Sequence, residues 1–263
     1  MHSACVLQTV VALASVAADP GSRLLLVRHG ETNFNSDGRL QGRLESELTA
    51  KGHEQASALG QWLTSAEAAS VDRVFVSPKK RTRQTLAGIE SHATSLPAAE
   101  VRPGAREIEL TIWEGQYKMN LKDADGNDDS ARWAQWNAHP ASFVFDEDGH
   151  APLVDLKSRA KAEWLHYVAA TPAESTSLVV AHGAFNRVFL MTALGLPVDD
   201  FGFNDKHFEF ENCALIELSW TAGATHASAW RKRYPSASEW RTRDEEVQRR
   251  MREEHASLTK GEL

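Results

Sequence analysis

The stretch "LLLVRHGET" at residues 24–32 runs a group of apolar residues directly into an arginine, a histidine and a glycine. A short apolar run of this length is typical of a strand that is buried on both faces of a parallel sheet. In open α/β sheets, ligands bind at the carboxyl ends of the strands. We therefore expect Arg28 and His29 to lie at a ligand-binding edge of such a sheet.

Similar runs recur along the chain and predict the other strands of the sheet. Besides residues 23–27, the segments "RVFVS" at 73–77 and "SLVVAH" at 177–182 have the composition of central strands. Near the end of the chain, "NCALIELSW" at 212–220 and "HASAWRKRY" at 226–234 are separated by a short Gly-containing linker. These two segments predict a further pair of strands towards one side of the sheet.

Helical patterns separate the predicted strands. Thr49 can cap a helix that places Ala56 and Leu59 on one face, and residues 80–93 and 184–197 continue from the second and third strands as helices. Alternation of strands and helices is typical of a parallel sheet covered by helices on both faces. The sequence therefore predicts an α/β fold in three layers, with a mostly parallel central sheet.

Composition changes along the chain suggest how it is organised. Residues 1–22 are apolar and lack Lys and Arg, which leaves a short helix and a processed leader as alternatives. Residues 23–235 are expected to form a single domain, with a cap inserted at about 107–155, where Asp, Asn, Gly and Trp are frequent. Residues 236–263 are strongly polar and predict a solvated helix. We favour a cytoplasmic location, with a plastid or secretory leader as the alternative.

Charge and cysteine content exclude several classes of protein. The chain has 29 basic and 36 acidic residues, a formal net charge of −7, so it lacks the basic excess of nucleic-acid-binding proteins. The two cysteines, Cys5 and Cys213, provide neither a disulfide framework nor a thiolate metal cluster. The N-terminal apolar stretch is too short to span a bilayer convincingly, and we expect no membrane partner. The oligomeric state is not predicted.

Basic side chains follow all three predicted central strands. Arg28 and His29 follow the first strand, Arg81 lies one turn into the helix after the second, and His182 with Gly183 ends the third. Parallel strands share one carboxyl edge, and helix N-termini there add N–H groups and positive dipole ends. Guanidinium groups bind phosphoryl oxygens through paired hydrogen bonds. The sequence therefore predicts a dianion site at this edge.

These residue types also suggest a reaction. A histidine among cations has its neutral form favoured, which leaves a ring nitrogen free to attack phosphorus. The leaving oxygen then needs a proton from a carboxylic acid, for which "REIELTIWEG" offers Glu107, Glu109 and Glu114. Two histidines with carboxylates also fit a metal site, but a closely spaced third ligand is absent and two arginines would repel the ion. We expect neither a metal nor another cofactor.

The combined pattern resembles the histidine phosphatases, the phosphoglycerate-mutase-like superfamily. "VRHGETNFN" at 27–35 is similar to the family signature, and "GRLQGRLESELTAKGHEQA", "SPKKRTRQT", "REIELTIWEG" and "VVAHGAFNR" follow in the family's order. The resemblance implies that His29 is the phosphorylated nucleophile and that Glu107 is the proton donor. It also implies a phosphate pocket that includes Arg28, Arg81 and His182. Residues implied or expected to contact substrate are Thr32, Asn35, Arg39 and Gly183.

Three details refine the resemblance. Thr111 stands where the family commonly has glycine, so Glu109 and Glu114 remain alternatives for the acid. "GRLQGRL" and "REIEL" look like the phosphatase branch rather than the cofactor-using mutases. Residues 131–164 are similar to the matching region of plant and algal 2-carboxy-D-arabinitol-1-phosphatases, which implies a sugar phosphate or bisphosphate substrate.

Several alternatives stay open at this point. The predicted activity is metal-independent hydrolysis of small phosphomonoesters, with a mutase and a catalytically silent binding protein as alternatives. The cap could meet a second anionic group of the substrate through basic residues, or these residues could belong to a solvated surface: Lys118, Lys122, Arg132 and His150. Trp133, Trp136 and Trp164 are expected to be packing anchors of the cap rather than a platform for a sugar.

Overall fold

The structure is a computed structural model that describes residues 21–65, 70–236, 238, 241–247, 249–250 and 253. The predicted N-terminal helix or leader therefore lies almost wholly outside the described residues. Within the described part, no helix combines the length and the apolar character that a membrane span requires.

The described strands form one mixed sheet in the order β3-β2-β4-β1-β5-β6-β7. The pairs β3-β2, β2-β4 and β4-β1 are parallel, whereas β1-β5, β5-β6 and β6-β7 are antiparallel. This arrangement confirms the predicted α/β fold with a mostly parallel centre. The strands are β1 (Ser22–Arg28), β2 (Arg73–Val76), β3 (Ala99–Val101), β4 (Thr176–Ala181), β5 (Leu215–Trp220), β6 (Ala229–Tyr234) and β7 (Arg241–Thr242).

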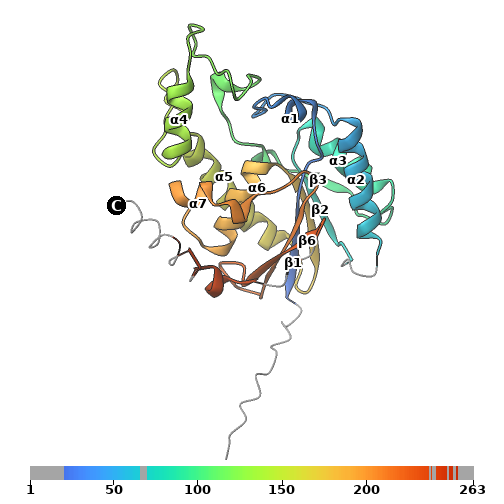
Figure 1. The fold of residues 1–263 in the computed structure, drawn as a ribbon. Helices are drawn as coiled ribbons and strands as arrows, with labels where there is room; N and C mark the ends of the chain where they lie inside the picture. Colours follow the sequence, from blue (N-terminus) through green and yellow to red (C-terminus); the bar gives the residue numbers. More distant parts are fainter. Residues whose placement is uncertain are drawn as a thin grey trace, which may run out of the picture.

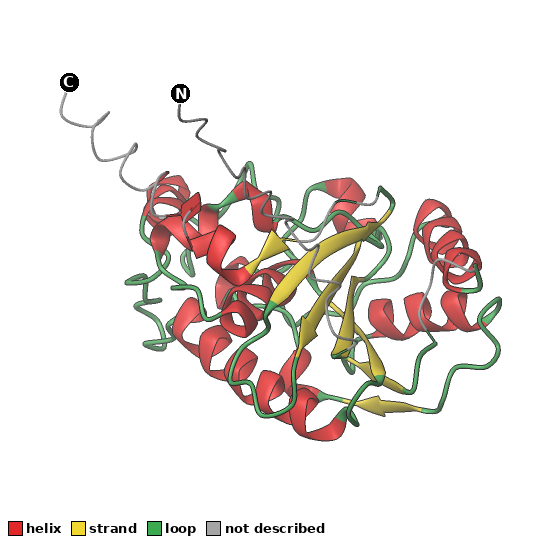
Figure 2. Cartoon of the chain, turned by 90° about the horizontal axis from the view of Figure 1, so that it is seen from below, coloured by secondary structure: helices red, strands yellow, loops and turns green. Residues whose placement is uncertain are grey.

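Helices cover both faces of the sheet (Figures 1 and 2). Alternate residues of β1 point to opposite faces: Leu25 and Val27 pack with α2 and α3, and Leu24 and Leu26 belong to the larger core that includes α5 and α6. The helices are α1 (Asn33–Asp37), α2 (Ala50–Leu63), α3 (Lys80–Glu90), α4 (Ser130–Ala138), α5 (Pro152–Ala170), α6 (Gly183–Leu194) and α7 (Asp200–Asn204), with 3₁₀ turns η1 (Pro103–Ala105), η2 (Thr111–Trp113) and η3 (Lys206–Phe208).

Between β3 and α5 the chain leaves the sheet and rises beside its carboxyl edge, with α4 on the outside (Figure 1). Its interior is aromatic: the Trp113 ring lies 4.7 Å from Phe145 and 5.4 Å from Trp133, centroid to centroid. Trp136 is also packed there, 5.6 Å from Phe143. Aromatic packing therefore gives this cap its own small core, continuous with the core below it.

Trp164 differs from the prediction, since it is an anchor of the main body rather than of the cap. It lies on α5, packs against Phe189 and Trp220, and donates its indole N–H to the Thr225 carbonyl. α5 itself was not predicted, although its buried positions recur at helical spacing after Pro152.

The described part of the C-terminal segment also differs from the solvated helix that we predicted. Glu246 and Arg250 are almost fully buried. Arg250 donates to the Pro197 carbonyl and to Asp199, while Arg249 pairs with Asp205. Arg249 and Arg250 thus meet carboxylates near α7 and η3, so these two arginines are packed against the domain and not solvated.

Candidate active site

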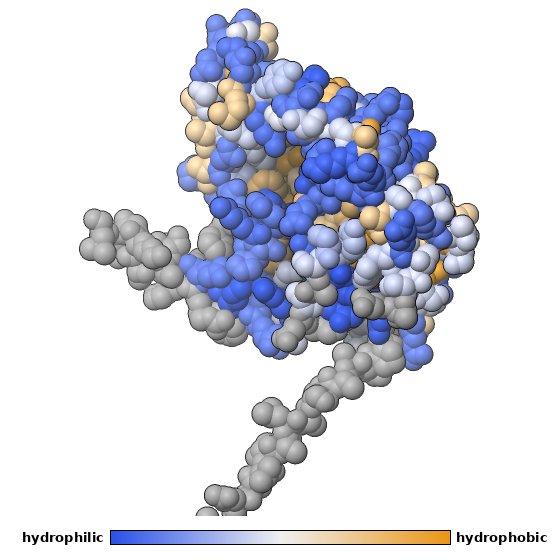
Figure 3. All heavy atoms as spheres, turned by 45° about the vertical axis from the view of Figure 1, so that its right-hand side comes forward, coloured by the Kyte–Doolittle hydropathy of each residue, from blue (hydrophilic) through white to orange (hydrophobic). Residues whose placement is uncertain are grey.

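A cavity of about 470 Å³ opens at the carboxyl edge of the sheet, between the cap and the main body. Figure 3 shows a hollow beside the cap, with apolar residues inside and hydrophilic residues around it. Several sequence-predicted residues line this cavity: Arg28, Asn35, Arg39, Glu107 and Gly183. His29, Arg81 and His182 are almost fully buried and lie behind the lining. The predicted residues are thus gathered at one edge of the sheet, as the strand ends indicated.

His29 follows β1 and is held as a neutral ring with a defined proton position. Its Nδ1 lies 2.8 Å from the Gly30 carbonyl oxygen, which can only accept, so Nδ1 carries the proton and Nε2 keeps a free lone pair. Burial, and then the charges of Arg81 and Arg28, hold the pKa of His29 well below its usual range. A buried, neutral imidazole with an unprotonated Nε2 is suited to nucleophilic attack.

His182, at the end of β4, has the opposite tautomer. Arg81 Nε donates to His182 Nδ1 at 3.1 Å, so the proton of the neutral ring lies on Nε2, which donates to Ser77 Oγ at 2.7 Å. Burial and the charge of Arg81 hold the pKa of His182 well below its usual range. The two imidazole rings lie 5.4 Å apart, centroid to centroid, in an edge-on arrangement.

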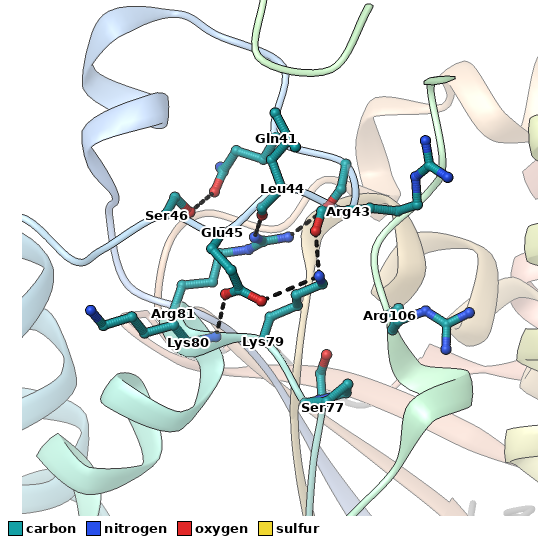
Figure 4. A network of polar contacts seen from close by, with 12 residues as sticks. Gln41, Arg43, Leu44, Glu45, Ser46, Ser77, Lys79, Lys80, Arg81 and Arg106 are labelled. Carbon is teal, nitrogen blue, oxygen red and sulfur yellow. Dashed lines mark hydrogen bonds and ion pairs between the residues drawn. The ribbon is translucent and has the colours of Figure 1, made fainter. Parts of the chain in front are cut away.

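Arg81 lies on α3 and connects this helix to the loop that contains Gly42 and Leu44 (Figure 4). Its Nη1 donates to the Leu44 carbonyl at 2.8 Å and its Nη2 to the Gly42 carbonyl at 3.0 Å, and Gly42 lines the cavity. With the bond from Nε to His182, three of the five guanidinium N–H groups are used. Two N–H groups remain for an anion, on a side chain whose direction is fixed from three sides.

Arg28 lines the cavity beside the start of α6. Its Nη1 donates to the Phe210 carbonyl at 2.6 Å, and its buried Nε has no hydrogen-bond partner among the described residues. A side chain at Gly183 would place its Cβ only 3.3 Å from Arg28 Nε, so glycine there leaves the arginine its room. Buried donors without partners are uncommon and mark places where a ligand is expected.

Glu107 is the one of the three candidate acids that lines the cavity. Its Oε1 accepts from the Phe185 N–H at 3.0 Å, and its Oε2 accepts from the Ala184 N–H at 3.3 Å, so the carboxyl group caps α6. Glu109 instead pairs with Arg43 at 2.6 Å, and Glu114 pairs with the same arginine at 3.1 Å. The geometry thus favours Glu107 for a role at the substrate.

Thr111 has φ +39°, in the left-handed region that a β-branched residue rarely adopts. Its hydroxyl is buried without a partner among the described residues. This is the position where glycine was noted as the common residue, and the backbone keeps a conformation that suits glycine. Thr111 therefore holds a backbone conformation that costs local strain in the acid segment.

The residues after the signature shape the pocket wall. Thr32 is fully buried behind the lining, where its hydroxyl caps α1 and contacts Gln41 Oε1 at 3.1 Å. Thr32 thus orients Asn35 and Gln41, which both line the cavity, and does not itself reach it. Gln41 Oε1 also accepts from Ser46 at 2.6 Å (Figure 4), which fixes its amide with the NH₂ group as the remaining donor. Sequence reasoning missed Gln41.

Further cations separate into two groups. Lys118 lines the cavity, and burial together with Arg28 lowers its pKa. Arg187, which the sequence analysis missed, also lines it and donates to the Phe203 carbonyl at 2.6 Å. The other cap candidates lie outside the lining: Lys122, Arg132, which pairs with Glu147, and His150, which contacts the Glu109 carbonyl. Trp133 and Trp136 pack in the cap and also form part of the cavity wall.

Among the described residues, one group of carboxylates and imidazole lies close enough together for a metal, namely Asp205, His207 and Glu253. None of the three lines the cavity, and Arg249 contacts all of them. The cation already present in this cluster is therefore a guanidinium.

Comparison with known proteins agrees with this arrangement. Over 208 residues the chain is 38% identical to a probable 2-carboxy-D-arabinitol-1-phosphatase of Arabidopsis thaliana, covering 78% of this chain and 39% of that protein, so the chain spans well under half of that relative's length. It is 28% identical to a probable phosphoglycerate mutase GpmB of Klebsiella pneumoniae, covering 79% and 89%.

The solved structure of Bacillus stearothermophilus YhfR has the same fold, with a TM-score of 0.66 and 23% identity over 79% of this chain and 95% of that one. The sequence profile of the Histidine phosphatase superfamily (branch 1) matches residues 24–233. A match over most of the chain, together with the ordered motifs around His29 and His182, shows that the chain belongs to the histidine phosphatase superfamily.

Proposed function

We propose that the protein is a metal-independent phosphatase that hydrolyses small phosphomonoesters through a phosphohistidine. The observation that carries the proposal is His29, a buried neutral ring with Nδ1 bound to the Gly30 carbonyl, an unprotonated Nε2, and a pKa lowered by burial and by the charges of Arg81 and Arg28. The phosphatase names of relatives, among them the 38% identical plant protein, support hydrolysis.

The reaction has two steps. His29 Nε2 attacks phosphorus and the ester oxygen leaves with a proton from Glu107, while Arg28, Arg81 and His182 stabilise the charge of the transferring group. A water molecule then attacks the phosphohistidine, gives its proton to Glu107, and releases inorganic phosphate with His29 restored. Each step thus passes one proton through the same carboxyl group.

The test is release of inorganic phosphate in the presence of EDTA, from a panel of sugar phosphates, sugar bisphosphates and 3-phosphoglycerate. We expect turnover by the wild-type protein that His29→Ala abolishes. We also expect the wild-type protein to take up a phosphoryl label from the substrate, and this label should be labile in acid. Turnover that EDTA removes, or that His29→Ala keeps, contradicts the proposal.

A mutase is the second candidate, because the chain is also 28% identical to the probable phosphoglycerate mutase GpmB. In a mutase the phosphohistidine returns its phosphoryl group to the substrate instead of to water. Conversion of 3-phosphoglycerate to its isomer without phosphate release would favour this candidate. Binding of the panel without either reaction would favour a phospho-ligand binding protein.

Lys118 supports a substrate with a second anionic group. Lys118 lines the cavity, and burial, then the charge of Arg28, lower its pKa more than Glu107 raises it. No ion pair or side-chain hydrogen bond of Lys118 is found among the described residues. A cation that is partly desolvated and repelled by its neighbour gains most from an anion supplied by the ligand. We therefore propose that the substrate carries a carboxylate or a second phosphate that reaches Lys118 from the phosphoryl site.

A matched pair of substrates tests this role. In 3-phosphoglycerate a carboxylate stands where glycerol 3-phosphate has a hydroxymethyl group. We expect Lys118→Ala to lower kcat/KM for 3-phosphoglycerate by about tenfold, the loss of one charged hydrogen bond, and to leave glycerol 3-phosphate nearly unchanged. Lys122→Ala, in the same cap but outside the lining, is the control. Equal losses for both substrates would exclude Lys118 as the contact for the second anion.

A further inference from the structure

Arg159 on α5 connects that helix to the segment that carries Glu107. Its Nη1 donates to the Gly104 carbonyl at 3.0 Å and to the Arg106 carbonyl at 2.7 Å, and its Nη2 donates to the Glu107 carbonyl at 3.2 Å. Its Nε is bound to Asp155 at 2.7 Å, one turn earlier on the same helix. A single guanidinium therefore contacts three carbonyls within four consecutive residues.

These carbonyls have no other donor among the described residues. The segment from Arg102 to Leu110 contains only the 3₁₀ turn η1, and neither the Arg106 nor the Glu107 carbonyl takes part in a backbone hydrogen bond. Because regular secondary structure does not fix this stretch, the side chain of Arg159 does so. Its side chain is only 14% exposed, so water competes weakly for these bonds.

A second contact ties the same segment to α5. Arg102 donates through Nε and Nη2 to the two oxygens of Glu163, at 3.0 and 3.2 Å. Glu163 lies one turn after Arg159, and Gly104 packs so closely on it that a Cβ would lie 2.1 Å from Oε1. The acid segment is thus held at two points along α5, and Arg159 is the one next to Glu107.

Arg102 and Arg159 do not line the cavity, so they act on the acid segment from behind the site. The carboxyl group of Glu107 is bound to the first turn of α6, and its main chain is bound to α5 through Arg159. The side chain therefore bridges two helices, and its place relative to His29 depends on both. Misplacement of a catalytic group by about 1 Å can lower a rate by about a hundredfold.

We propose that Arg159 is a positioning residue for the proton donor, which fixes Glu107 where the leaving oxygen departs. This inference rests on the proposed function, in which Glu107 donates that proton. It predicts a specific defect: loss of Arg159 slows the step that needs the proton and leaves phosphoryl transfer to a good leaving group largely intact.

The experiment compares phenyl phosphate with p-nitrophenyl phosphate, two substrates of similar shape whose leaving groups differ in their need for a proton. The rate at which phenol or p-nitrophenol is released in the first turnover is measured by rapid quench for Arg159→Lys. Lysine keeps the positive charge but lacks the guanidinium that contacts Asp155 and the three carbonyls together. We expect at least a tenfold loss for phenyl phosphate and less than about a threefold loss for p-nitrophenyl phosphate. KM should change little, because Arg159 does not touch the substrate.

Two variants make the outcomes distinct. Arg132→Lys changes an arginine of the cap that is 23% exposed and pairs with Glu147, and it controls for a general loss of ion pairing; we expect both substrates to react at the wild-type rate. Glu107→Gln should show the leaving-group dependence most strongly.

If Glu107→Gln shows it and Arg159→Lys does not, or if Arg159→Lys slows both substrates equally, the positioning role is overturned. If Glu107→Gln itself slows both substrates equally, the acid assignment of the proposed function fails, and the inference fails with it.

Discussion

At the scale of single residues, the site depends on two buried, neutral histidines that carry their proton on different ring nitrogens. His29 donates a hydrogen bond from Nδ1–H to the Gly30 carbonyl, and His182 Nδ1 accepts one from Arg81 Nε, so the two rings are opposite tautomers. Neither contact would tolerate the other's tautomer, because a carbonyl cannot donate and a guanidinium cannot accept. The backbone of Gly30 and the side chain of Arg81 thus decide which ring nitrogen of each histidine is free.

This neutrality predicts a dependence of stability on pH. The pKa of His29 is well below its usual range in the folded protein, whereas in the unfolded chain it is about 6.5. The unfolded chain therefore binds more protons below this value, so the stabilisation is fully present above about pH 6.5 and is lost as the pH falls below it. The free energy of unfolding is measured with urea at pH 6 and at pH 5. From pH 6 to pH 5 it should fall by about 1 kcal/mol more for the wild type than for His29→Asn.

The control for this comparison is His53→Asn, which removes an exposed histidine of α2. Its dependence on pH should match the wild type. Identical slopes for wild type and His29→Asn would mean that His29 takes up a proton in the folded state, and that burial and the two arginines do not hold it neutral.

At the scale of elements, the parts predicted from sequence are those whose signals are local. β1, β2 and β4 follow apolar runs, and the residues after β1 and β4 meet because parallel strands share a carboxyl edge. β3 has three residues, two of them exposed, which is too little for a hydrophobic pattern. Its place at the edge of the sheet depends on pairing with β2, which no local pattern contains.

The missed site residues have a related explanation. Gln41 lies in the loop after α1 and is fixed by Thr32, and Arg187 lies on α6 and is held by the Phe203 carbonyl. Their roles depend on contacts outside their own segments, which no local pattern contains. Even for Glu107 the sequence left three candidates, and Arg43 separates them by pairing with Glu109 and Glu114. The sequence places the proton donor in one segment but does not say which of its glutamates it is. Ion pairs with a residue far away in the chain decide which carboxyl group stays in the pocket.

At the scale of the whole molecule, the described C-terminal residues return to the segment that closes one side of the cavity. Arg250 is 3% exposed and donates to the Pro197 carbonyl and to Asp199, which caps α7. α7 contributes Phe203 and Asn204 to the cavity lining. The described C-terminal residues therefore support a wall of the pocket that comes from an earlier part of the chain. Arg250 and Asp199 are 51 residues apart.

Arg250→Ala tests whether this long-range contact supports the pocket wall. Its loss removes charged hydrogen bonds that are mostly buried, so we expect the free energy of unfolding to fall by about 2 kcal/mol. Amide exchange at residues 202–204 should accelerate more than exchange in β1, because α7 loses its support while the central sheet does not. Lys206→Ala, an exposed residue in η3 that follows α7, is the matched control and should change neither quantity. If Arg250→Ala lowers stability but exchange rises evenly over the whole domain, the C-terminal segment stabilises the fold as a unit and has no particular role at the pocket wall.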